Sequence, residues 1–143
     1  MMASEAYLDT SVLVPLFVID SSAERARAFM ETETPTPIVS DFAAAEFASA
    51  VSRLVRTNAL NSAQAASIFS AFDTWRARSA TECWVEKTDV ATASAILRRL
   101  DSSLRTPDAL HLAMARRIGV PLATFDQRLA EIAMENGVTI ALA

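Results

Sequence analysis

Four acidic residues stand at positions from which their carboxylates could meet. Asp9 interrupts the apolar stretch AYLDTSVLVPLF, Asp108 is the fourth residue of RTPDALHLA, Asp126 follows VPLATF, and Glu46 lies inside DFAAAEFASAV. A buried, unpaired carboxylate is costly because its charged form loses its hydration. The apolar residues on both sides of Asp9 therefore indicate that this carboxylate has a partner or a task.

Four converging carboxylates repel one another unless some hold protons or a cation neutralises them. Hard oxygen ligands favour Mg²⁺ or Mn²⁺. Mg²⁺ usually takes one or two carboxylates, keeps several waters and leaves room for a substrate phosphate. Such an ion lowers the pKa of a bound water and neutralises charge on a phosphate, which suits phosphodiester hydrolysis.

Each acid also has an ordinary structural explanation. Asp9 and Asp126 could cap the helices that follow them, and Asp108 suits the positive first turn of a helix. Glu46 has no capping role. It shares one polar helical stripe with Arg53, and that stripe could simply be a solvated face; if it faces a cleft, Arg53 would contact RNA.

The two glycines show how the chain alternates between helix and strand. Gly119 and Gly137 each follow a helical pattern and precede a β-branched run, as expected of a left-handed residue after a helix. The same patterns predict strands at Ala6–Leu8, Ile38–Val39, Trp84–Val85, Leu122–Thr124 and Val138–Ala141. They predict helices at Ser22–Glu31, Phe42–Thr57, Ser62–Ala77, Asp89–Leu100, Pro107–Ile118 and Gln127–Asn136, with Pro35 and Pro37 in a turn and Thr106 as an N-cap.

This alternation predicts an α/β fold: a compact α/β/α sandwich around a short, mainly parallel sheet, in one domain spanning residues 1–143. In open parallel sheets, ligands bind beyond the carboxyl ends of the strands. Asp9 and Asp126 follow such strand ends, and Asp108 begins a helix. The topology therefore favours a shared site at that edge.

Composition narrows the function classes. The chain is 52% hydrophobic, and its one cysteine, Cys83, can form no internal disulfide and is expected to be a small buried residue. No apolar run is long enough to span a bilayer, so we expect a soluble, cytoplasmic protein without membrane contact. The net charge is −4, but without the four acids the remaining 13 acidic residues equal the 13 basic ones, so RNA is not excluded as a partner.

Other catalytic signatures are scarce. With two glycines there is no phosphate-binding P-loop, and the sequence has neither a G-x-S-x-G motif nor a Cys–His pair. The single histidine, His111, follows Asp108 by one turn and could contact the site, although a packed helix residue is the more common case. Phe69, Phe72 and Trp75 are expected in the core or in a subunit interface.

The order of four segments resembles the PIN-domain ribonucleases, and within them the VapC-type toxins of bacterial toxin–antitoxin pairs. The segments are YLDTSVLVPLF, VSDFAAAEFASAV, RTPDALHLAMARRIGVPLATFD and VTIAL. The resemblance implies that the acidic quartet, Asp9, Glu46, Asp108 and Asp126, binds one or two Mg²⁺ or Mn²⁺ ions. It also implies that Thr10, Ser11 and Thr124 place hydroxyl groups near the metal or the scissile phosphate.

The same resemblance implies an endoribonuclease that cuts cellular RNA and arrests growth. It further implies a homodimer that is silenced by an antitoxin protein, with DNA contacts made by the antitoxin and not by this chain alone. Two alternatives within the family are a non-toxin RNA-processing nuclease and a catalytically silent binding module. A haloacid dehalogenase-type phosphatase is disfavoured because position 11 is serine where a second aspartate is expected.

Overall fold

The structure is a computed structural model, and it describes residues 4–142. Its strands are β1 (Glu5–Leu8), β2 (Thr36–Ser40), β3 (Thr81–Cys83), β4 (Leu122–Ala123) and β5 (Ile140–Leu142). Its helices are α1 (Thr10–Leu13), the 3₁₀ turn η1 (Val14–Leu16), α2 (Ala23–Glu33), α3 (Asp41–Arg56), α4 (Ser62–Ser79), α5 (Lys87–Leu97), α6 (Thr106–Ile118) and α7 (Gln127–Glu135).

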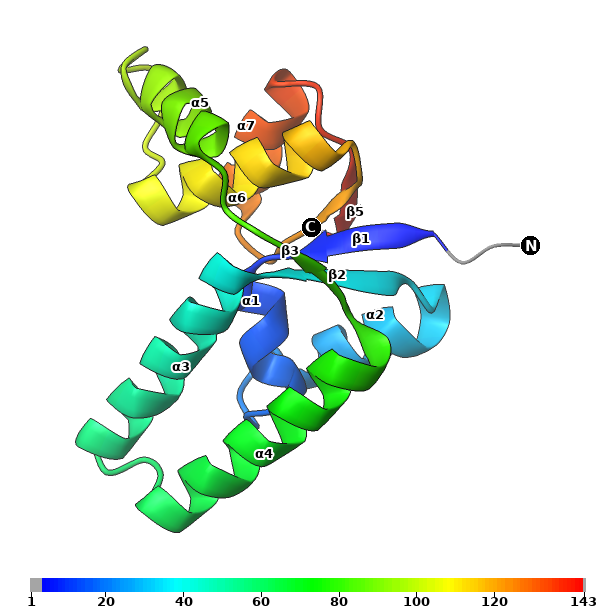
Figure 1. The fold of residues 1–143 in the computed structure, drawn as a ribbon, viewed down its shortest axis with the longest axis vertical. Coiled ribbons are helices and arrows are strands. Elements are labelled where there is room, and N and C mark those ends of the chain that lie inside the picture. The colour runs from blue at the N-terminus through cyan, green and yellow to red at the C-terminus, as the bar shows by residue number, and fades with distance from the viewer. Residues whose placement is uncertain (1–3, 143) are drawn as a thin grey trace.

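The five strands form one sheet in the order β3-β2-β1-β4-β5, and every neighbouring pair is parallel. Helices α5, α6 and α7 cover one face, while α1 to α4 cover the other, with α3 and α4 extending downward as a long hairpin (Figure 1). Each face has its own buried apolar cluster. The predicted α/β/α sandwich is therefore confirmed.

The sheet brings distant segments to one edge. β1 is central and pairs with β2 on one side and with β4 on the other, with Leu8 opposite Ala123. Because all strands run the same way, the residues that follow β1, β2 and β4 leave the sheet at the same edge. Asp9, the N-terminus of α3 and the segment that begins at Thr124 all follow those strand ends.

Several predicted boundaries were wrong. The third strand lies at Thr81–Cys83 and not at Trp84–Val85; it is an edge strand with two exposed residues, so it carries no apolar pattern. Pro37 lies inside β2 and not in a turn. It is opposite Ala6 of β1, and β3 pairs with β2 only from Ile38 onward. The N-cap of α6 is Arg105, since Thr106 is already helical. The last strand begins at Ile140.

The aromatic residues of α4 belong to the core. Phe72 is buried and stacks on Phe47 of α3 with ring centroids 4.1 Å apart, while Phe17 meets both Phe72 and Trp75 edge to face. Such pairs contribute about 0.5–1.5 kcal/mol beyond the area they bury. These contacts fasten the α3–α4 hairpin to the segment that follows α1.

In the opposite layer, a buried aspartate forms an ion pair with a partly exposed arginine. Asp89 at the start of α5 is 1% exposed, and it accepts hydrogen bonds from Arg117 Nε at 2.8 Å and Nη2 at 3.0 Å. The Asp89 carboxylate also caps the backbone N–H of Glu86, and Arg117 Nη2 donates to the Trp84 carbonyl. Cys83 is buried beside this pair, as predicted, and burial raises the pKa of its thiol. One arginine of α6 thus holds both α5 and the end of β3.

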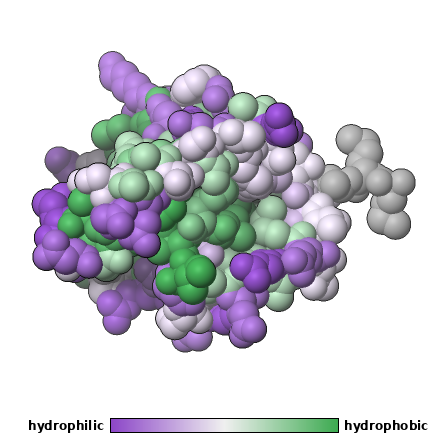
Figure 2. Space-filling model, turned by 90° about the horizontal axis from the view of Figure 1, so that it is seen from below, coloured by the Kyte–Doolittle hydropathy of each residue, from purple (hydrophilic) through white to green (hydrophobic). Residues whose placement is uncertain are grey.

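Within residues 4–142, no helix is long and apolar enough to cross a membrane. Seen from below, the surface shows apolar side chains gathered in its middle, with hydrophilic side chains around them (Figure 2). In the lower layer, a groove between η1, α2 and α4 is lined by the apolar residues Pro15, Leu16, Phe17, Met30 and Trp75 and by the charged residues Arg27 and Glu31. This layer therefore carries apolar surface as well as core.

Candidate active site

Asp9 is held by three hydrogen bonds at the end of β1. It is 4% exposed. Its Oδ1 accepts from Ser11 Oγ at 2.6 Å and from the backbone N–H of Val12 at 3.3 Å, and its Oδ2 accepts from Thr124 Oγ1 at 2.5 Å. The predicted cap is thus present, but the two hydroxyl bonds go beyond capping because one comes from the segment after β4.

Burial raises the pKa of Asp9, even though the hydrogen bonds from Ser11 and Thr124 act in the opposite direction. The charged form of this carboxylate is therefore disfavoured inside the protein. A buried acid with a perturbed pKa at a strand end is a frequent feature of functional sites.

Glu46 lies on α3 beside the start of α1. Its Oε1 accepts a hydrogen bond from Thr10 Oγ1 at 2.6 Å and makes a second one with His111 Nε2 at 2.5 Å. Burial alone would raise the pKa of Glu46, but the bonds from His111 and Thr10 outweigh it and lower the pKa. The simpler interpretation of the polar stripe on this helix, a solvated face, therefore does not hold for Glu46, which is bonded to Thr10 and His111.

Asp9 and Glu46 are connected through the first residues of α1. Thr10 binds Glu46 and Ser11 binds Asp9, and Ser11 also accepts from the backbone N–H of Phe125 at 2.9 Å. Segments after β1, β2 and β4 therefore meet at one point. All three hydroxyl groups singled out in the sequence, those of Thr10, Ser11 and Thr124, lie in this network.

The other two acids lie at the starts of α7 and α6, and within the described chain only Asp126 is linked to the Asp9 network by a hydrogen bond. Asp126 is the N-cap of α7 and accepts from the backbone N–H groups of Arg128 and Leu129 at 3.0 and 3.1 Å. Its own N–H donates to Thr124, which links it to Asp9. Asp108 accepts from the backbone N–H of Arg105 at 3.1 Å. Both carboxylates thus also serve the capping roles that the sequence suggested.

His111, Tyr7 and Ser40 join the site, although the sequence gave no role to Tyr7 or Ser40. His111 is 3% exposed, and its Nδ1 lies 2.6 Å from Tyr7 Oη, which in turn lies 2.8 Å from Ser40 Oγ. The available signals were spacings: Tyr7 precedes Asp9 by two residues, and His111 follows Asp108 by one helical turn. Neither spacing identifies the hydrogen-bond partner, because the residues in contact come from elements that are far apart in the sequence.

The residues fit a hard divalent cation only in part. Within the described chain, no group of three or more His, Cys, Asp or Glu side chains is arranged to hold a metal ion. Asp9 and Glu46 nevertheless supply two carboxylates, with hydroxyl groups around them, beside one helix start. Two carboxylates and several waters make up a common Mg²⁺ site, so the donor set fits Mg²⁺ or Mn²⁺ by its chemistry.

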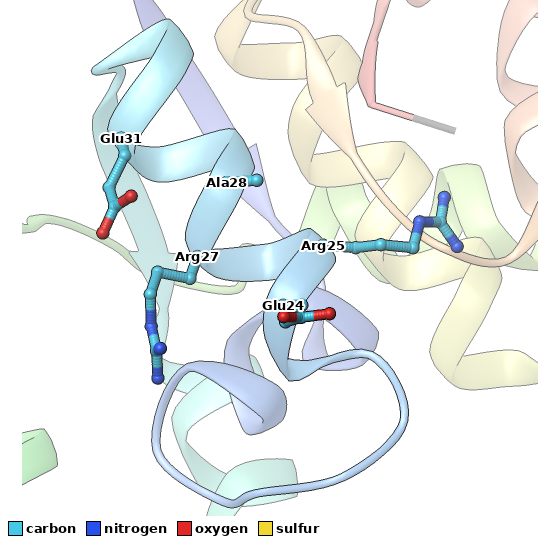
Figure 3. A pocket seen from close by; sticks show the side chains of 5 residues that line it. All are labelled: Glu24, Arg25, Arg27, Ala28 and Glu31. Atoms are coloured by element: carbon cyan, nitrogen blue, oxygen red, sulfur yellow. The ribbon is translucent and has the colours of Figure 1, made fainter.

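Arg53 lies outside this network, exposed on α3 two turns beyond Glu46. A separate hollow of 450 Å³ lies on the outer surface of α2, where Glu24, Arg25, Arg27, Ala28 and Glu31 line it (Figure 3). Its side chains come from one helix, and Arg25 and Arg27 point to opposite sides of it. None of the residues around Asp9 and Glu46 lines that hollow, so it is not the candidate active site.

Comparisons with known proteins agree on the fold. The VapC20 toxin of Mycobacterium tuberculosis, described as cleaving the sarcin–ricin loop, has a TM-score of 0.71 at 18% identity over 90% of this chain and 95% of its own. A toxin–antitoxin complex from Klebsiella pneumoniae gives 0.65 at 22% identity, covering 96% and 98% of the two chains. VapBC2 from Rickettsia felis, bound to a fragment of its promoter DNA, gives 0.68 at 12% identity over 94% and 96%.

No curated protein matches the sequence significantly. The family model of the PIN domain matches residues 6–135, which include all four acids, the ends of β1 and β4, and His111. This match covers nearly the whole chain and agrees with the parallel sheet and its two helical layers. The protein therefore belongs to the PIN-domain family.

Proposed function

We propose that this chain is a metal-dependent endoribonuclease and the toxin of a toxin–antitoxin pair. One observation carries the proposal: two carboxylates, Asp9 and Glu46, are held by hydroxyl and imidazole groups at the carboxyl edge of the sheet. This is the edge at which parallel α/β folds bind ligands. The PIN-domain match and the toxin structures among its structural neighbours support the same activity.

In this proposal, Asp9 and Glu46 hold Mg²⁺ or Mn²⁺, and Asp108 and Asp126 add negative charge at the same edge. The bound ion would lower the pKa of a water molecule and neutralise charge on the scissile phosphate. Ser11 and Thr124 keep the Asp9 oxygens in fixed directions, and Thr10 does the same for Glu46. Fixed ligands reduce the reorganisation that phosphodiester hydrolysis would otherwise require.

The substrate in this proposal is RNA, and Arg53 is a candidate contact to its backbone. We expect Arg53→Ala to weaken RNA binding about equally for all sequences and to reduce the slope of log affinity against log salt by about one unit. Binding titrations with Asp9→Asn protein, at several salt concentrations, would measure this slope without cleavage. An unchanged slope would assign Arg53 to the solvated face, and Arg78→Ala at the far end of α4 is the matched control.

The proposed partners are a second copy of this chain and an antitoxin protein. The neighbours from Klebsiella pneumoniae and Rickettsia felis are toxin–antitoxin complexes, which supports an antitoxin partner here. The groove between η1, α2 and α4, which is apolar apart from Arg27 and Glu31, offers surface that a protein partner could cover. DNA contacts would be made by the antitoxin and not by this chain alone, as the resemblance to VapC-type toxins implies.

Growth of a bacterial host tests the toxin role. We expect induction of the wild-type gene to arrest growth within a few generations, and co-expression of the neighbouring gene to restore it. Induction of Asp9→Asn to the same protein level should leave growth unaffected, since the metal site is incomplete. Normal growth with abundant soluble wild-type protein would contradict the toxin role but not the nuclease activity, which leaves an RNA-processing enzyme as the alternative.

A further inference from the structure

A chain of hydrogen bonds crosses the fold from β2 to Glu46. It runs from Ser40 Oγ to Tyr7 Oη at 2.8 Å, from Tyr7 Oη to His111 Nδ1 at 2.6 Å, and from His111 Nε2 to Glu46 Oε1 at 2.5 Å. Ser40 and Tyr7 are both fully buried, and His111 is 3% exposed. Only the Glu46 end reaches solvent, with 27% of its side chain exposed.

The direction of these bonds follows from counting protons. Ser40 Oγ already accepts the backbone N–H of Ala43 at 2.9 Å, as the cap of α3. The buried Ser40 proton needs an acceptor, and among residues 4–142 Tyr7 Oη is the one that lies within reach. The single Tyr7 proton has two possible acceptors, His111 Nδ1 at 2.6 Å and Met114 Sδ at 3.9 Å. The shorter contact favours Nδ1, which leaves Nε2–H to donate to Glu46.

Glu46 is held by one oxygen only. Its Oε1 receives both His111 and Thr10, whereas its Oε2 has no hydrogen-bond partner among the described residues. Two donors on one oxygen fix the rotation of the carboxyl group. The other oxygen is left without a partner there, and because 27% of the side chain is exposed, a ligand can reach the carboxyl group.

We propose that His111, oriented by Tyr7 and Ser40, is a positioning residue that holds Glu46 so that Oε2 faces a divalent cation. This inference rests on the proposed function, because it concerns the ligand set of the same site. Partners of this kind commonly set metal affinity, and their loss lowers affinity or activity about 10-fold to 100-fold. The Ser40, Tyr7 and His111 members of the chain are buried, so water does not compete for the bonds between them.

The test is the affinity for Mn²⁺, measured by isothermal titration calorimetry without RNA. We expect His111→Ala to raise the Kd for Mn²⁺ about 10-fold or more. His111→Gln should restore a Kd close to that of the wild type, because its amide nitrogen can donate from the position of Nε2. Tyr7→Phe should weaken binding in the same direction, since it removes the group that orients the imidazole.

Asp89→Asn is the control for a purely structural effect. It breaks an ion pair that shares no hydrogen-bond partner with Glu46, so it should lower the Tm and leave the Kd for Mn²⁺ unchanged. RNA cleavage at saturating Mn²⁺ adds a second readout: His111→Ala should recover much of the wild-type rate there, which a misfolded site would not.

Each outcome decides the inference. A wild-type Kd in folded His111→Ala overturns it and leaves the nuclease proposal intact. If His111→Ala does not fold, Tyr7→Phe decides, and a wild-type Kd in that variant overturns the inference. Failure of the wild type itself to bind Mn²⁺ overturns both the inference and the metal dependence of the proposed function.

Discussion

Asp9→Asn is expected to abolish RNA cleavage while the metal-free protein stays at least as stable as the wild type. The activity should fall by more than the 10-fold to 100-fold typical of residues that merely support a metal ligand, because Asp9 is proposed to be a ligand itself. The near-identical shape of asparagine keeps a carbonyl oxygen for Val12 N–H, and the Ser11 and Thr124 hydroxyls can rotate.

The stability part follows from the raised pKa of Asp9. Because its folded pKa lies above the unfolded value, the wild type is most stable where Asp9 is protonated, and stability is lost as the pH rises through the folded pKa. Asparagine carries no charge, so this loss should be absent from the variant. Thermal melts with EDTA, from acidic to neutral buffers, would measure both proteins.

The controls for this variant separate chemistry from folding. Added Mn²⁺ should raise the Tm of the wild type, as binding to the native state does, and should not raise that of Asp9→Asn. A markedly lower Tm for the variant in EDTA would show that Asp9 serves the fold. Cleavage at the wild-type rate by the variant would remove Asp9 from the catalytic set.

Asp89→Asn should produce a clear loss of stability. Asp89 is 1% exposed and receives three hydrogen bonds, two of them from Arg117. Breaking a fully buried pair costs about 3–5 kcal/mol, but 31% of the Arg117 side chain is exposed, so we expect a loss of about 1–3 kcal/mol. Chemical denaturation would show this as a lower midpoint with an unchanged slope.

The matched change is Asp73→Asn, at an exposed position of α4. It removes the same charge from the surface and should change the free energy of unfolding by less than about 0.5 kcal/mol. Equal stability of Asp89→Asn and Asp73→Asn would mean that the Asp89–Arg117 pair contributes nothing net to the fold.

The sequence predicts the helix–strand alternation well because its markers are local. Gly119 and Gly137 have φ values of +77° and +81°, the left-handed conformation that their position after helices required. Asp9 was expected to be buried, since its neighbours are apolar, and its exposure of 4% confirms this. Strand β3 was misplaced because its exposed edge position removes the apolar pattern on which strand prediction relies.

From the sequence, only those site residues could be predicted whose type and position in the chain are distinctive. Acids at strand ends are visible in the sequence, as is a hydroxyl beside them. The partners of His111 are not, because Tyr7 lies 104 residues away and reaches it through the sheet topology. Likewise, no spacing shows that Glu46 leaves one oxygen without a partner among the described residues.

The most direct test of the central claim is cleavage of bulk bacterial RNA by the purified wild-type protein, with Mn²⁺, with EDTA and with Asp9→Asn in parallel. The account predicts discrete fragments in the wild-type Mn²⁺ sample alone, and the fragment ends would identify the target. Fragments that persist with EDTA or with Asp9→Asn would contradict a metal-dependent site at Asp9. Intact RNA in every sample, together with no Mn²⁺-induced rise in Tm, would contradict the nuclease altogether.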